Sequence, residues 1–129
     1  MATINTRLIL QSKNLFSNSL NQRVDKSFPI TAEVLKRVKS ITATSSGSAT
    51  TLLTVSEYGA DKDVFVFIRN RATAKAKHLY IIIGSQQIIK LAPGQYSILP
   101  WRTESGDDLK IYGDDSNGIN VEYLVGTMT

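Results

Sequence analysis

The sequence predicts an all-β chain: a single antiparallel β-sandwich, jelly-roll-like in its connections, preceded by an extended N-terminal arm. Short runs rich in β-branched and aromatic residues recur along the 129 residues, separated by turn signals about every 8–12 residues. The length suits one hydrophobic core and is too small for two. Neither a strand–helix alternation nor a fixed-period repeat is visible, which disfavours doubly wound, propeller and solenoid folds. We place a basic arm or edge segment at 1–33 and the sandwich at 34–129.

The N-terminal region combines short strands with polar sequence. The run "TRLILQSK" is interpreted as a short apolar strand, and the Asn- and Ser-rich "NLFSNSLNQ" as a loop or irregular arm. The proline in "RVDKSFPIT" suits an edge or bulge position. The segment "AEVLKRVKSITAT" fits both helical spacing and strand alternation, and we assign it to a strand, or to a short helical turn that runs into one.

The middle of the chain is expected to supply buried strands. After the loop "TSSGS", the run "ATTLLTVSE" has the Thr, Leu and Val content of a strand. "VFVFIRNR" has no polar residue before Arg69, which indicates burial on both faces. "HLYIII" is a second buried strand, and "GSQ" follows it as a turn.

Two hairpins are predicted in the C-terminal part. "SQQIIKL" and "QYSIL" flank Ala92-Pro93-Gly94-Gln95, whose Pro and Gly fit the second and third positions of a type II turn. "DLKIYG" and "INVEYLVG" alternate cleanly and are expected to pair through "DDSNG". Pro100 cannot donate to a ladder, so Trp101 is expected at the end of its strand.

Positive charge is concentrated at the N-terminus. The chain carries 15 Lys and Arg against 11 Asp and Glu, yet up to residue 40 there are seven cations and two acidic residues. We expect this region to dock on an acidic protein surface, or on the acidic C-terminal region of a neighbouring copy. Nucleic acid is a weaker alternative, because "LKRVK" offers only a small basic cluster without interleaved aromatic residues. The candidate partner-binding residues are Arg7, Lys13, Arg23, Lys26, Lys36, Arg37 and Lys39.

No residue pattern points to catalysis, a cofactor or a metal. The chain has no cysteine, and its one histidine, His78, has no second histidine and no spaced nucleophile to complete a site. The acidic pairs Asp107/Asp108 and Asp114/Asp115 are interpreted as turn residues; a cation site and paired-carboxylate catalysis are the alternatives. No apolar run is long enough for a membrane helix, and no secretory signal is apparent. We therefore expect a non-enzymatic binding or assembly protein, made in a cytoplasm.

The single tryptophan has three interpretations. Trp101 caps the core, lies with Tyr96 in an oligomer seam, or forms a sugar-stacking platform with Tyr96 and Tyr112.

The order "DVFVFIRNR", "APGQYSILPW", "DLKIYG" and "INVEYLVG", over residues 63–126, resembles small virion proteins of tailed bacteriophages, most of all capsid decoration (cement) proteins. The resemblance implies a non-enzymatic β-sandwich on the capsid exterior, assembled in the host cytoplasm. It also implies a trimer or dimer that binds the major capsid protein or another virion protein through an N-terminal arm or loops. The alternatives are a phage tail or head-to-tail connector component and a carbohydrate-binding β-sandwich module.

Overall fold

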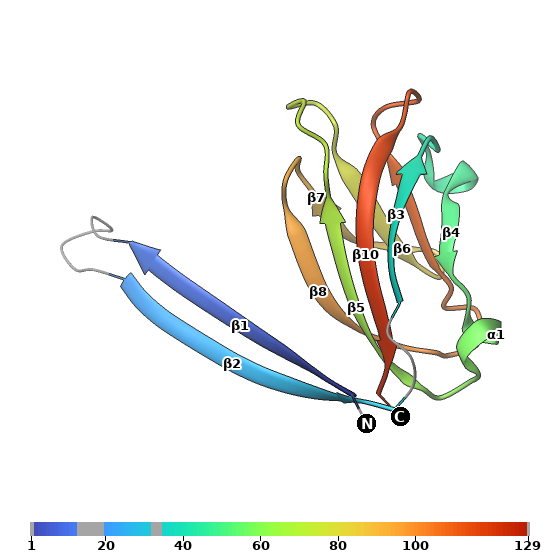
Figure 1. The fold of residues 1–129 in the computed structure, drawn as a ribbon. Helices are drawn as coiled ribbons and strands as arrows, with labels where there is room; N and C mark the ends of the chain where they lie inside the picture. Colours follow the sequence, from blue (N-terminus) through green and yellow to red (C-terminus); the bar gives the residue numbers. More distant parts are fainter. Residues whose placement is uncertain (1, 13–19, 32–34, 129) are drawn as a thin grey trace.

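The computed structural model describes residues 2–12, 20–31 and 35–128. It confirms the all-β prediction: two four-stranded antiparallel sheets lie face to face, and a separate two-stranded hairpin projects from one end (Figure 1). The front sheet has the strand order β3-β10-β5-β8 and the back sheet the order β4-β9-β6-β7. All but one of the connections between consecutive strands from β3 to β10 cross from one sheet to the other, which is the eight-stranded jelly-roll arrangement.

The strand bounds are as follows. The hairpin consists of β1 (Ala2–Ser12) and β2 (Leu20–Ile30). The front sheet consists of β3 (Leu35–Ile41), β10 (Ile119–Thr127), β5 (Asp63–Asn70) and β8 (Tyr96–Arg102). The back sheet consists of β4 (Thr50–Leu53), β9 (Leu109–Gly113), β6 (Leu79–Ile83) and β7 (Gln86–Leu91). Two short helical turns, η1 (Ser46–Ser48) and α1 (Val55–Tyr58), flank β4.

Alternation along the strands fills one core between the sheets. In β5, Val64, Val66 and Ile68 point inward and are fully buried. The intervening Phe65 and Phe67 point to the outer face, where Phe65 is also buried. The prediction of burial on both faces therefore holds for the first half of β5.

Both predicted C-terminal hairpins are wrong, although the predicted turn between β7 and β8 is present. Gly94 has φ +81°, and the Gln95 amide donates to the Ala92 carbonyl at 3.0 Å, as in a type II turn. However, β7 pairs with β6 and β8 pairs with β5, and β9 and β10 likewise belong to opposite sheets. A turn reverses the chain through local dihedral angles, but burial across the whole sandwich decides which sheet the next strand joins. The predicted turn at "GSQ" is present, and it joins β6 and β7 as a hairpin.

Other boundaries also differ from the prediction. Within "ATTLLTVSE" the strand ends at Leu53, and α1 begins at Val55. Residues Leu20–Gln22, expected in a loop, belong to β2, while 13–19 lie outside the described residues. The ambiguous segment is a strand from Leu35, as favoured, and its first residues, 32–34, are likewise outside the description.

A buried asparagine ties together the loops at one end of the sandwich. Asn70 Nδ2 donates to the carbonyls of Lys77 at 2.8 Å and Leu91 at 3.0 Å, and its Oδ1 accepts from the Ala72 amide at 2.9 Å. Its side chain is fully buried and uses both amide hydrogens and the carbonyl oxygen. Asn70 therefore fixes the path of the β5–β6 connection against the end of β7.

Candidate protein-docking surface

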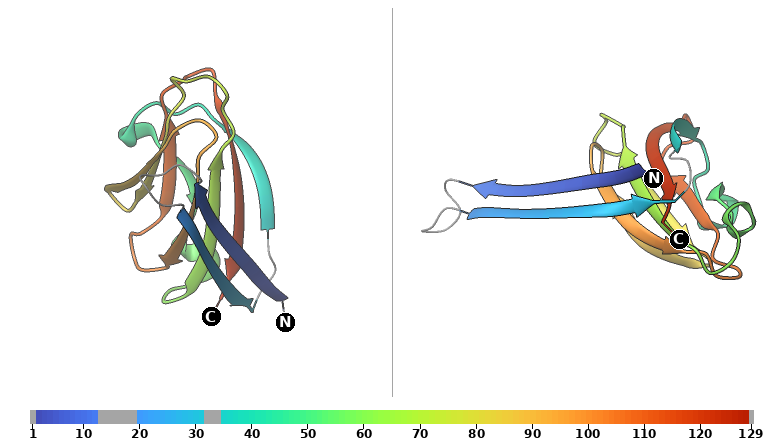
Figure 2. Two further views of the ribbon diagram at one scale, coloured as in Figure 1. Left: turned by 90° about the vertical axis from the view of Figure 1, so that its left-hand side faces the viewer. Right: turned by 60° about the horizontal axis from the view of Figure 1, so that its bottom comes forward.

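The hairpin is the most prominent candidate site because it lies largely outside the sandwich. β1 and β2 pair along their full lengths, from Ala2 opposite Ile30 to Ser12 opposite Leu20. With about 3.4 Å per residue, eleven residues extend about 35 Å. Figures 1 and 2 show that the hairpin leaves the end of the sandwich where β10 finishes and diverges from the outer face of the front sheet.

The register divides the hairpin into two faces. Ile4 pairs with Phe28, Thr6 with Lys26 and Leu8 with Val24, so these side chains share one face. Leu10 follows on the same side, because alternate residues of a strand point the same way. We call this set the apolar arm face, and its members are Ile4, Thr6, Leu8, Leu10, Val24, Lys26 and Phe28.

The opposite, polar arm face carries an ion-pair network. The Asp25 carboxylate accepts from Arg7 Nε at 3.1 Å and from Arg23 Nε at 2.8 Å. Ser27 Oγ donates to Asn5 Oδ1 at 2.7 Å across the same face. These groups are exposed, so each pair contributes on the order of 0.5 kcal/mol or less. Two guanidiniums against one carboxylate leave the face with net positive charge.

Three contacts anchor the root of the hairpin. The rings of Phe28 and Phe65 lie 5.0 Å apart between centroids, and the Thr31 amide donates to the Thr127 carbonyl at 2.9 Å. Ile30 is 1% exposed and covers Gly126, where a Cβ would lie 3.0 Å from Ile30 Cδ1. A side chain at position 126 would therefore require Ile30 to shift within its buried site.

An apolar groove of about 290 Å³ lies where the hairpin diverges from the front sheet. Its sheet wall consists mainly of outer-face side chains of β5, β8 and β10, among them Ile98, which is 43% exposed. Both walls come from one chain, and their apolar side chains line the space between them. The lining residues are Ile4, Thr6, Arg7, Phe65, Phe67, Ile98 and Leu124.

The predicted cations fall into two groups. Arg7 and Arg23 lie on the polar arm face, and Lys26 lies on the other face with Nζ 6.0 Å from the centroid of the Phe28 ring. Lys13 lies outside the described residues. The remaining three, Lys36, Arg37 and Lys39, belong to β3.

β3 is an edge strand of the front sheet, so its cations have a structural role as well. Lys36 Nζ lies 3.7 Å from Glu122 Oε1. Exposed lysines along a sheet edge discourage pairing with another strand. Protection of the sheet edge is enough to explain why Lys36, Arg37 and Lys39 are present. They are therefore weaker docking candidates than the cations of the hairpin.

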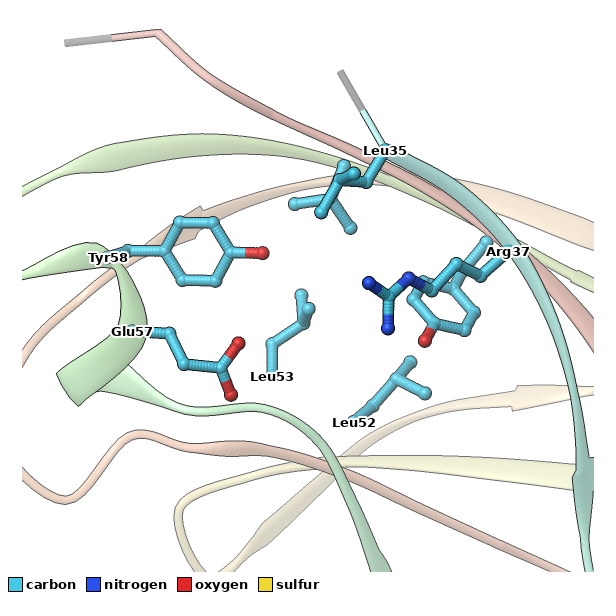
Figure 3. Close-up of a pocket in the computed structure, with 8 residues that line it drawn as sticks. Leu35, Arg37, Leu52, Leu53, Glu57 and Tyr58 are labelled. Carbon is cyan, nitrogen blue, oxygen red and sulfur yellow. The ribbon is translucent and has the colours of Figure 1, made fainter. Parts of the chain in front are cut away.

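Arg37 lines a separate small pocket between the edges of β3 and β4. The pocket has a volume of about 60 Å³. Figure 3 shows Arg37, Glu57 and Tyr58 pointing into it. Burial, and then the negative charge of Glu57, raise the pKa of Tyr58 above its ordinary value, while Arg37 acts in the opposite direction. The full lining is Leu35, Arg37, Leu52, Leu53, Glu57, Tyr58, Tyr123 and Val125.

The acidic turn after β9 is held by local interactions. Asp115 accepts from the Asn117 amide at 2.8 Å and pairs with Lys77 Nζ at 3.0 Å, and these two contacts lower its pKa. His78 Nδ1 lies 3.2 Å from Asp114 Oδ2. In the described part of the chain, no three His, Cys, Asp or Glu side chains gather to form a metal site. The geometry supports the turn interpretation of this segment.

Trp101 and Tyr96, predicted together as a possible seam, lie in different environments. Trp101 is 1% exposed in the core, its Nε1–H donates to the Asp107 carbonyl at 2.8 Å, and the Tyr58 ring meets it edge-on. A side chain enclosed by its own chain cannot contact a partner or stack on a sugar, so the seam and platform interpretations are corrected to core closure. Tyr96 is 55% exposed on the outer face of β8. Pro100 is accommodated beside Trp101 because β8 is an edge strand.

The apolar arm face was missed by the sequence reasoning. The alternation of Leu8 and Leu10 in "TRLILQSK" was the available signal, but it became interpretable only once β2 was known to place Val24 opposite Leu8.

The helices in the described ranges are all too short or too polar to cross a membrane. Comparison with known proteins adds no relative: no protein-family model matches the chain, and no curated protein matches it.

Proposed function

We propose that this chain is a non-enzymatic structural protein of a bacteriophage particle, which decorates the capsid exterior by binding shell subunits through its N-terminal hairpin. The partner is the major capsid protein or another virion protein. The observation that carries the proposal is the hairpin itself, anchored at its root by Phe28 and Ile30 and projecting well beyond the sandwich.

The hairpin extends away from the sandwich and carries positive charge. Its polar arm face presents Arg7 and Arg23 around the Asp25 carboxylate, and both arginine side chains are about half exposed. A surface of this kind is attracted to an acidic protein face, and many copies on a lattice multiply a weak contact into stable attachment. The resemblance of residues 63–126 to decoration proteins supports the same role. The jelly-roll fold is compatible with this role but does not distinguish it from others, because lectin domains have the same fold.

The test removes the hairpin's charge without removing its structure. In R7Q/R23Q, glutamine can still donate to Asp25, so the hairpin is retained while its positive charge is lost. Binding to particles that lack the protein, measured by co-sedimentation, is expected to fall at least about tenfold and to lose most of its salt dependence. The matched control K62Q/K75Q removes two exposed cations from loops of the sandwich and should bind normally.

The result that overturns the proposal is equally direct. If R7Q/R23Q decorates particles as well as the unaltered protein does, the polar arm face is not the docking surface. A deletion of residues 2–26 extends the test, because it keeps Phe28 and Ile30 on the front sheet. Retention of decoration in that variant would exclude the hairpin altogether.

A further inference from the structure

We propose that the apolar arm face is covered by the same face of a second copy of this chain, in a two-fold symmetric pair whose arms run antiparallel. The inference is independent of the capsid as partner, because it concerns the face of the hairpin opposite to Arg7 and Arg23.

The apolar arm face is incompletely covered in the single chain. Leu8 and Leu10 are each 43% exposed and Val24 is 50% exposed. Of nine large apolar side chains exposed in the described part of the chain, four belong to the hairpin, and only Ile9 among these lies on the polar arm face. A two-stranded hairpin is marginally stable in water without a packed face. The outer half of this hairpin therefore requires a covering surface.

The charge pattern favours self-association through this face. Arg7, Arg23 and Asp25 all lie on the polar arm face. On the apolar arm face, the described ionisable side chain is Lys26, which lies near the root beside Phe28. In the antiparallel pair the contact therefore includes one cation from each copy, Lys26, whose long stem lets its ammonium reach solvent at the edge of the face and avoid the cost of a buried unpaired charge. Packing of the polar arm faces would instead bring four arginines together.

The groove at the root supplies the remaining contact. Two hairpin faces of about 35 by 10 Å bury about 700 Å² between them, which is less than the roughly 1,200–2,000 Å² of a stable interface. In an antiparallel pair, however, the outer half of each arm lies over the root of the other. Leu8 and Val24 of one copy then reach the partner's groove, about 290 Å³ in volume, and cover Ile98 and Phe67. The symmetry repeats this contact, because each residue pair occurs twice in a two-fold interface.

The experiment measures the mass of the full chain in solution by sedimentation equilibrium. The expected result is a particle of twice the 14.2 kDa chain mass, dissociating on dilution. L8T/V24T keeps residues that favour strands but makes the apolar arm face polar, and I98T changes the groove wall. Each is expected to weaken dimerisation at least about tenfold. I88T is the matched control, since Ile88 is 44% exposed on β7 of the back sheet and away from the arm.

The outcomes separate this inference from the proposed function. R23Q, at a position that does not line the groove, should remain dimeric even though it binds particles more weakly. Emission from buried Trp101 verifies that the sandwich of each variant is folded. A chain that is monomeric at about 100 µM, a trimer or larger ring, or a dimer unaffected by both L8T/V24T and I98T would overturn the inference. The last of these outcomes would assign the apolar arm face to a different protein.

Discussion

Phe28 of the hairpin rests on Phe65 of the front sheet, with ring centroids 5.0 Å apart and planes inclined by 53°. This contact joins the arm to the jelly roll and explains why Phe65 is 3% exposed although it points to the outer face of its sheet. The position of the hairpin thus depends on a small number of side chains at its root.

Replacing Phe28 by alanine is expected to lower the free energy of unfolding by about 1–2 kcal/mol, because it removes a half-buried ring and its aromatic contact. Urea denaturation followed by Trp101 fluorescence measures the change. F28L keeps apolar volume and should lose less than half as much. An unchanged midpoint in F28A would show that the root contact does not stabilise the chain.

Gly126 and Ile30 form a second test of the root. G126A places a methyl group 3.0 Å from Ile30 Cδ1 and should cost about 1–3 kcal/mol by overpacking. Shortening the facing side chain in G126A/I30V should restore part of that loss, since the two changes affect one contact. If the loss in the free energy of unfolding of the double variant equals the sum of the losses of G126A and I30V, Ile30 does not cover Gly126 in solution.

Asn70 is expected to be the most sensitive polar residue of the sandwich. N70L removes three hydrogen bonds and leaves the carbonyls of Lys77 and Leu91 without this donor, so a loss of about 2–4 kcal/mol is expected in urea unfolding. N120L changes an exposed asparagine of the same sheet and should remain within about 0.5 kcal/mol. Comparable stabilities of the two variants would contradict the role of Asn70.

The pocket beside α1 gives a prediction at high pH. Burial and Glu57 raise the pKa of Tyr58 in the folded chain, whereas in the unfolded chain it stays near 10.0. The associated stability is therefore fully present below pH 10 and is lost as the pH rises through the folded-state pKa. The pKa of Tyr58 is measured from tyrosinate absorbance after the titration of Y58F is subtracted, and it should lie above 10.0. R37Q should raise this pKa further, because it removes a nearby positive charge. A Tyr58 pKa at or below 10.0 would contradict the geometry of the pocket.

Local patterns predicted the strands but not their partners. The β-prone run at Asp63–Asn70 and the turn at Gly94 depend on nearby residues, and both are present. The pairing of β8 with β5 instead of β7 depends on which side chains fill a core shared by distant segments. The sequence around Asn70 likewise did not indicate that its side chain would be buried and would make three hydrogen bonds. Asparagine is also a common turn residue, so its position after a strand had a simpler explanation.

The candidate site shows the same limit. The cations of the N-terminal region were visible in the sequence, but their separation into a hairpin face and an edge strand depends on the register of β1 with β2. Trp101 looked available to a partner because only its neighbours in the chain were known. Its enclosure results from packing against Tyr58 and the β8–β9 connection.

Hydrogen exchange on the full chain, free and bound to particles, tests most directly whether the hairpin is the docking element. The account predicts slower exchange on binding in residues 2–12 and 20–30, with little change in the core strands, which are already protected. Protection gained only in the loops of the sandwich, with unchanged exchange in the hairpin, would contradict it.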